Sequence, residues 1–80
     1  SSGIFEVEVR ENGNRLAECL SAVGIAAEVS AEQPHRLTVT LVEQQLEQFW
    51  QTVLGSGEQV RHFAPMRITL ERAFIELLEG

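Results

Sequence analysis

The side chains able to bind a metal ion are few and are scattered along the chain. Cys19 is the single cysteine, and His35 and His62 are the two histidines. No pair of them has the short spacing of a zinc motif, and the chain contains no C-x-x-C. The sequence therefore predicts no metal site, and we expect Cys19 to be a buried, slowly reacting residue on the core side of a helix.

Nucleophilic or acid–base catalysis would need a constellation that the sequence does not provide. Ser21, Ser30 and Ser56 have no recognisable base and acid close to them in the sequence. All twelve acidic residues are Glu, and most of them fall on polar faces, where a solvated carboxylate is the expected state. We therefore predict no catalytic residue and no enzymatic activity for this chain by itself.

The binding of nucleotide phosphates has no support in the sequence either. The chain has no Gly-rich phosphate loop, and it has no Lys to complete one. The turn at Glu11–Arg15, which precedes a predicted helix, offers an anion only one Arg beside a Glu. We therefore predict no cofactor, and we expect the isolated chain neither to bind nor to hydrolyse ATP.

The net charge of −6 argues against several classes of partner. A negative surface disfavours the phosphates of nucleic acids and anionic membranes. On the polar sheet face predicted below, the first and third strands offer charged and hydroxyl side chains and no aromatic side chain that would stack on RNA bases. The longest apolar runs are too short to span a bilayer, so we expect no direct membrane insertion. One cysteine and no secretory signal indicate a reducing compartment.

Apolar periodicity divides the 80 residues into the elements of one α+β domain. Alternating residues predict strands at 4–10, 25–29, 36–41 and 59–64. The turn at 11–14 offers an Asn side chain to cap the first helix. That helix is stopped by Gly24, and its core-side stripe is Leu16, Cys19, Leu20 and Val23. A second helix ends at 55–57, and its stripe is Val42, Leu46, Phe49, Trp50, Val53 and Leu54.

The order β-α-β-β-α-β predicts a ferredoxin-like sandwich with a four-stranded antiparallel sheet. Right-handed crossovers would place both helices on one face of the sheet. On the fourth strand we expect Val60, His62 and Ala64 to point inward. The other face should be polar and should face water. Its expected members are Glu6, Glu8, Arg10, Glu28, Arg36, Thr38, Thr40 and Arg61, with Ile4 and Phe63 as apolar exceptions.

The last residues predict an additional C-terminal helix that the sandwich itself does not need. Pro65 ends the strand-like run because it has no N–H for a sheet ladder. Thr69 can cap a helix, and Glu71 places negative charge in its first turn. We expect this helix to fold back on its own domain through an apolar stripe. The candidate docking residues are Leu70, Phe74, Ile75, Leu77 and Leu78.

The run from Pro65 through Leu70-Glu71, Phe74 and Leu77 resembles the closing segment of exporter-type ABC-transporter ATP-binding subunits. There the segment ends a small C-terminal accessory domain that follows the ATPase domain. Arg72 departs from the family, which often has an acidic residue at that place. The resemblance implies that residues 4–80 form a non-catalytic regulatory and interaction domain, preceded by 1–3 as a linker or as added residues.

The resemblance also implies partners and a location. The partners would be the ATPase domain of the same polypeptide, its dimer mate and, indirectly, a separate permease subunit. The domain would then lie in the cytoplasm, peripheral to the inner membrane through the transporter complex. The alternative is a free-standing ferredoxin-like module that senses a small ligand, although no Gly-rich ligand loop follows the first strand.

Overall fold

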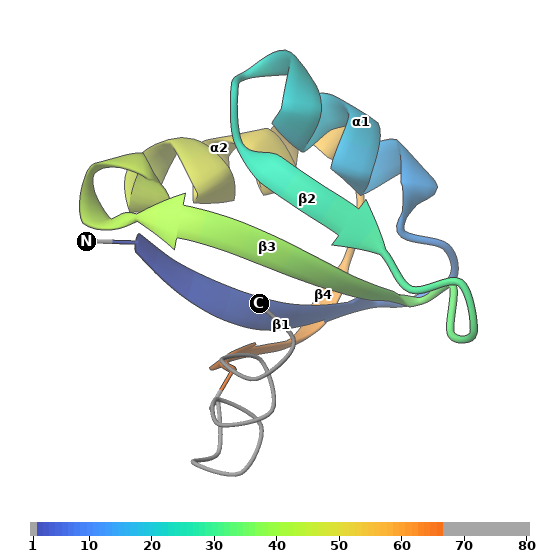
Figure 1. The fold of residues 1–80 in the computed structure, drawn as a ribbon. Coiled ribbons are helices and arrows are strands. Elements are labelled where there is room, and N and C mark those ends of the chain that lie inside the picture. The colour runs from blue at the N-terminus through green and yellow to red at the C-terminus, as the bar shows by residue number, and fades with distance from the viewer. Residues whose placement is uncertain (1, 67–80) are drawn as a thin grey trace, which may run out of the picture.

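The computed structural model describes residues 2–66 of the chain (Figure 1). Its strands are β1 (Ser2–Val9), β2 (Ala26–Val29), β3 (Arg36–Val42) and β4 (Val60–Pro65). Its α-helices are α1 (Asn14–Ala22) and α2 (Leu46–Ser56), and a 3-10 turn, η1 (Glu43–Gln45), leads from β3 into α2. The predicted additional C-terminal helix and its candidate docking residues lie outside the described residues.

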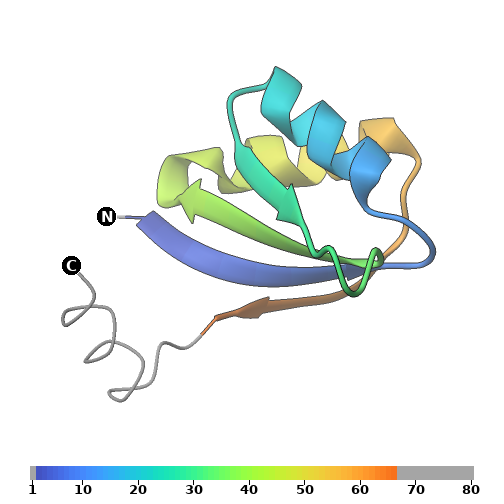
Figure 2. The same ribbon diagram turned by 45° about the vertical axis from the view of Figure 1, so that its right-hand side comes forward.

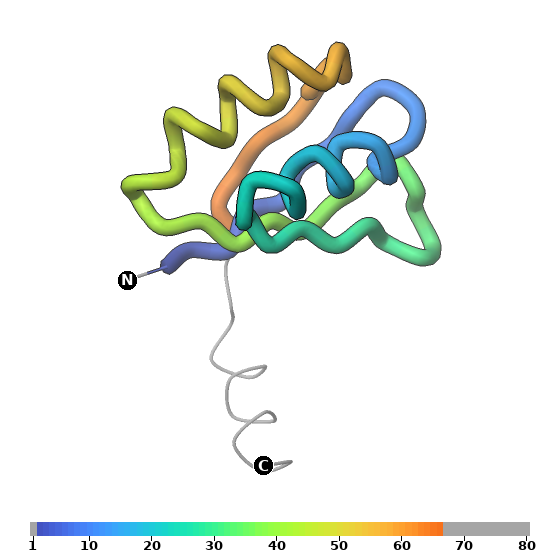
Figure 3. Tube along the Cα trace, turned by 90° about the horizontal axis from the view of Figure 1, so that it is seen from above, coloured from blue at the N-terminus to red at the C-terminus, as the bar shows by residue number. Residues whose placement is uncertain are grey.

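The four strands form one antiparallel sheet in the order β2-β3-β1-β4. Both helices cover one face of this sheet (Figures 1 and 2). No helix among residues 2–66 covers the other face, which we call the open face. Seen from above, α1 lies toward β2 and α2 lies toward β4 (Figure 3). The predicted α+β class with a four-stranded antiparallel sheet is therefore confirmed, and the arrangement is compatible with a ferredoxin-like sandwich. No helix within residues 2–66 is long and apolar enough to cross a membrane.

The element ends follow local backbone chemistry. The side chain of Asn12 accepts a hydrogen bond from the backbone N–H of Asn14 at 2.8 Å, at the start of α1. Gly24 follows α1 with φ of +81°, and Gly57 ends α2 with φ of +77°. This left-handed region is strained for residues with a Cβ, so glycine suits both positions. Both glycine stops were predicted from the sequence. The predicted Asn cap is wrong, because Gly13 occupies the N-cap position of α1 and makes no side-chain hydrogen bond to the helix.

The core lies between the helices and the sheet. In β3, buried Leu37, Val39 and Leu41 alternate with half-buried residues, as the period of a strand requires. Helix α2 adds Phe49 and α1 adds Leu16, both fully buried. The other buried apolar side chains are Val7, Val9, Leu20, Ile25 and Val53.

The loop between β2 and β3 packs against the turn between β1 and α1. The N–H groups of Val9 and Gly13 donate to the carbonyls of His35 and Pro34, each at 2.8 Å. Gly13 is buried, and a Cβ at this position would lie 2.5 Å from a methyl carbon of Leu37. The absent side chain at Gly13 therefore leaves room for the side chain of Leu37 at the start of β3.

The faces of β4 differ from the prediction because of a β-bulge. Glu8 pairs with His62 whereas Val9 pairs with Val60, so Arg61 is an extra residue without a partner on β1. The alternation therefore inverts after Val60. Val60 packs against the core as predicted. His62 and Ala64 were predicted to point inward, but they pair with Glu8 and Glu6, whose side chains lie on the open face.

The same bulge makes Phe63 a core residue rather than an apolar exception on the open face. Phe63 pairs with Val7 and packs against the core. Its ring centroid lies 4.9 Å from that of Phe5 and 5.3 Å from that of Phe49. Ile4, by contrast, is half-exposed and pairs with Thr40, so its predicted place on the open face is confirmed.

The helical stripes are narrower than predicted. In α1, Leu16 and Leu20 are buried, but Cys19 is only half-buried and Val23 is exposed. In α2, Phe49 and Val53 are buried, whereas Leu54 is exposed. Val42 lies in β3 rather than in the helix, and its N–H donates to Oε1 of Gln45 at 3.1 Å. A helix in a two-layer sandwich contacts the sheet along one line, so residues at the edge of a stripe stay exposed.

Candidate functional site

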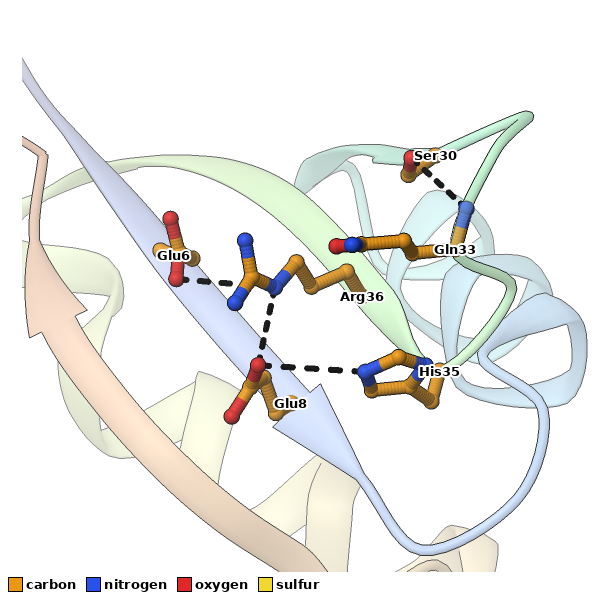
Figure 4. Close-up of polar contacts among 6 residues, drawn as sticks. All are labelled: Glu6, Glu8, Ser30, Gln33, His35 and Arg36. Carbon is orange, nitrogen blue, oxygen red and sulfur yellow. Dashed lines mark hydrogen bonds and ion pairs between the residues drawn. The ribbon is translucent and has the colours of Figure 1, made fainter.

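The open sheet face carries a cluster of charged side chains that contact one another (Figure 4). Nε of Arg36 donates to Oε1 of Glu8 at 2.8 Å, and it lies 3.7 Å from Oε1 of Glu6. Nε2 of His35 lies 3.9 Å from the same oxygen of Glu8. We call these residues, together with His62, the open-face cluster.

Strand register and one loop position this cluster. Glu8 pairs with Arg36 across β1 and β3, and with His62 across β1 and β4, so one carboxylate has a basic residue on each neighbouring strand. The loop before β3 is held by the N–H of Arg36, which donates to the carbonyl of Gln33 at 2.8 Å. The N–H of Gln33 in turn donates to Oγ of Ser30 at 3.1 Å.

The cluster stabilises the ionised form of Glu8. The hydrogen bond from Arg36 lowers the pKa of Glu8 from its ordinary value of 4.5, and the charges of Arg36, His62 and His35 act in the same direction against the desolvation of the carboxylate. The same hydrogen bond raises the pKa of Arg36. A carboxylate with a lowered pKa is a weak proton acceptor near neutral pH, so this arrangement suits ion pairing better than acid–base chemistry.

The three residues considered for a metal site are not brought together as ligands. His35 and His62 both lie near Glu8, whereas Cys19 lies on α1, on the opposite side of the sheet. Among residues 2–66 no group of three His, Cys, Asp or Glu side chains is placed to hold a metal ion. The approach of both histidines to one carboxylate depends on strand register and on the β4 bulge, and the spacing of residues in the sequence does not reveal it.

Helix α2 exposes a row of large apolar side chains, which we call the α2 ridge. The row consists of Leu46, Trp50 and Leu54, with exposed fractions of 40%, 38% and 82%. Their four-residue spacing places them on one side of the helix, next to the buried stripe. Trp50 is anchored at its inner edge, because its ring centroid lies 4.9 Å from that of Phe49 and 5.1 Å from that of Phe63. The ridge is therefore a fixed apolar surface on the β4 side of the helical layer.

An apolar cavity continues this surface at one end of the sheet. It has a volume of about 300 Å³, and its lining includes Phe5, Leu41 and Leu46. Gly3 also lines it and contributes no side chain to fill the space. Leu46 belongs to both the cavity and the α2 ridge, so the two form one continuous apolar surface. The cavity has few polar groups to orient a small molecule, and this favours an apolar side chain as its occupant.

The turn considered as an anion cradle forms the edge of a polar cleft. The described residues that line the cleft are Arg10, Glu11, Gly57, Glu58 and Gln59. Two carboxylates against one guanidinium make this cleft a poor site for phosphate, which needs an excess of positive charge or free N–H groups.

Comparison of the chain with models of protein families, with curated proteins and with solved structures found no match.

Proposed function

We propose that this chain is a non-catalytic regulatory and interaction domain, the C-terminal accessory domain of an exporter-type ABC-transporter ATP-binding subunit. The observation that carries the proposal is the α2 ridge. Its three large apolar side chains, one of them Trp50, are exposed beside an apolar cavity. Contiguous apolar surface of this kind is typical of sites that contact another protein element, and Trp is frequent at the centre of such contacts.

The position at which the described fold ends supports the proposal. The strand order β2-β3-β1-β4 fits a ferredoxin-like sandwich, and β4 ends at Pro65. The residues that resemble the family ending, Leu70-Glu71, Phe74 and Leu77, follow Pro65 in the sequence after a spacer of four residues. We propose that they form the additional helix after the sandwich and that the α2 ridge receives an apolar helix or strand of the same transporter subunit.

In this role the domain would be an appendage in the cytoplasm, peripheral to the inner membrane through the transporter complex. Its partners would be the ATPase domain of the same polypeptide and the dimer mate of that domain, and it would reach the permease subunit only through them. It would either steady the ATPase dimer or tune its activity. Chemistry would remain with the ATPase domain, because Glu6, Glu8, His35 and Arg36 of the open-face cluster pair with one another.

The first test is the coding sequence directly upstream of Ser1. An ATPase domain with a Gly-rich phosphate loop at that place would support the proposal. A start codon there would instead favour a free-standing module that senses a small ligand, with the apolar cavity as its binding site. Thermal unfolding of the chain with a panel of small apolar ligands would then be the decisive measurement.

The second test uses the complete ATP-binding subunit. Leu54→Glu places a charge on the α2 ridge, whereas Gln48→Glu adds the same charge on another exposed side of α2. We expect Leu54→Glu to change the ATPase rate or the dimerisation constant of the subunit, and Gln48→Glu to leave both unchanged. Equal behaviour of the two variants in both assays would contradict the proposed function.

A further inference from the structure

We infer that residues 70–78 of this chain are the element that covers the α2 ridge, as a helix lying along α2 in the same direction. This inference rests on the proposed use of the ridge as a docking surface and names its occupant. Three features of the described residues carry it: the place where β4 ends, the spacing of the ridge, and the cavity at its first residue.

The chain leaves β4 at the end of the sheet where the α2 ridge begins. The N–H of Met66 donates to the carbonyl of Ile4 at 2.8 Å. Ile4 is adjacent to Gly3, which lines the same cavity as Leu46. The four residue-to-residue steps from Met66 to Leu70 can span at most about 14 Å when extended. This length is sufficient to bring Leu70 to the cavity, but not to the far end of the sheet.

The apolar residues of the two segments have matching spacing. The ridge side chains stand at 46, 50 and 54, and the C-terminal stripe includes Leu70, Phe74 and Leu78. Each row has two intervals of four residues and is about 12 Å long in a helix. A helix that starts near Leu46 and runs along α2 would place Phe74 beside Trp50, because both rows rise by the same length for every four residues. Phe74 would then extend the aromatic group that contains Phe49 and Phe63.

The cavity and the polarity of the open face favour this side of the molecule. Leu70 would meet the cavity of about 300 Å³ that is lined by Phe5 and Leu41. On the open face, the apolar Ile4 has charged or hydroxyl-bearing residues around it, among them Glu6 and Thr40. An apolar stripe would bury more apolar surface on the ridge than over these groups, and burial of apolar surface is what stabilises such a contact.

Trp50 reports on this contact in the complete 80-residue chain, because it is the only tryptophan. We expect Phe74→Ala to move the emission maximum of Trp50 to longer wavelength and to steepen its quenching by acrylamide. Glu76→Ala, on the opposite side of the predicted helix, is the matched control and should leave both readings unchanged. Far-ultraviolet circular dichroism verifies that each variant is folded. An unchanged Trp50 signal in a folded Phe74→Ala variant would overturn the inference.

Cross-linking tests the position and direction of the helix without relying on an intact core. In a Cys19→Ser background, Leu54→Cys with Leu78→Cys should form an intramolecular disulfide under mild oxidation, since a disulfide needs Cβ atoms about 4 Å apart. The pair Ile4→Cys with Leu78→Cys is the control and should remain reduced. A disulfide in the control pair alone would place the segment on the open face. A disulfide between two chains, with a dimer in sedimentation, would identify a second copy as the occupant, and either result would overturn the inference.

The outcomes separate this inference from the proposed function. If Phe74→Ala leaves Trp50 unchanged while Leu54→Glu alters the ATPase subunit, the ridge contacts another domain and only the inference fails. If Phe74→Ala exposes Trp50 while Leu54→Glu changes neither the ATPase rate nor the dimerisation constant of the subunit, the inference is supported and the proposed regulatory function is contradicted.

Discussion

The open sheet face and the α2 ridge are two exposed surfaces of the same small domain, and they differ in whether their side chains are already satisfied. On the open face, Glu8 and Arg36 are hydrogen-bonded to each other. On the ridge, Leu54 is 82% exposed, and Leu46 and Trp50 are exposed as well. Exposed ion pairs add little to stability and need no cover, whereas a row of large apolar groups gains free energy when it is covered. The difference indicates that the α2 ridge, and not the open face, is the surface that binds another apolar element.

Helix α2 itself carries buried and exposed apolar residues on neighbouring sides, so substitutions in it can compare the core with the α2 ridge. Phe49 is fully buried against Phe63 and Trp50, so Phe49→Ala should lower the free energy of unfolding by about 3–5 kcal/mol. Leu54→Ala in a chain truncated after Met66 should change it by less than about 0.5 kcal/mol. Urea unfolding followed by circular dichroism measures both. A comparable loss for the two variants would show that the ridge is part of the core.

Glycine positions give the next largest contrast. Gly13→Ala would force a Cβ against Leu37 and should destabilise the domain by about 1–3 kcal/mol, the usual range for overpacking. Gly55 lies in α2 with no other atom within 4 Å of a Cβ added there. Gly55→Ala should therefore stabilise the domain, by up to about 1 kcal/mol, because alanine is the better helix former. Thermal unfolding of both variants should show a lower melting temperature for Gly13→Ala and a higher one for Gly55→Ala. A higher melting temperature for Gly13→Ala would contradict the close packing of Gly13 against Leu37.

A substitution in the open-face cluster should change the stability of the domain least. The direction in which this contribution depends on pH is set by the carboxylate of Glu8. The pKa of Glu8 is lower in the folded chain than its ordinary value of 4.5. Its contribution to stability is therefore present above about pH 4.5 and is lost as the pH falls through the lowered folded value. In Arg36→Gln the carboxyl resonance of Glu8 should titrate at a higher pH than in the wild type. An unchanged midpoint in the NMR titration would show that Arg36 does not hold the carboxylate.

Much of the fold could be predicted from periodicity, and the errors occurred where periodicity alone is insufficient. The alternation in β1 and β3 assigned their faces correctly, and Gly24 and Gly57 marked the ends of helices. The faces of β4 were wrong after Val60, because a bulge depends on pairing with another strand and leaves no mark in the period of its own strand.

For the candidate site, the sequence indicated apolar stripes but could not assign their edges. Trp50 and Leu54 were both assigned to the core side of the second helix, and both are exposed. Helical periodicity predicts which residues share a side of the helix. How many of them are buried depends on the strands and helices that pack against that side. The meeting of His35, His62 and Glu8 likewise depends on strand register. The use of residues 70–78 stays a prediction.

The bulge at Arg61 also affects how the length of this domain can vary. Arg61 occupies a position in the chain but none in the ladder, since Val60 and His62 pair with consecutive residues of β1. A version of the chain without this residue would keep Val60 and Phe63 inside and His62 outside, and would have an uninterrupted ladder. An insertion directly before Phe63 would instead move Phe63 to the open face and out of the aromatic group. Related sequences should therefore differ in length at Arg61 more readily than between His62 and Phe63.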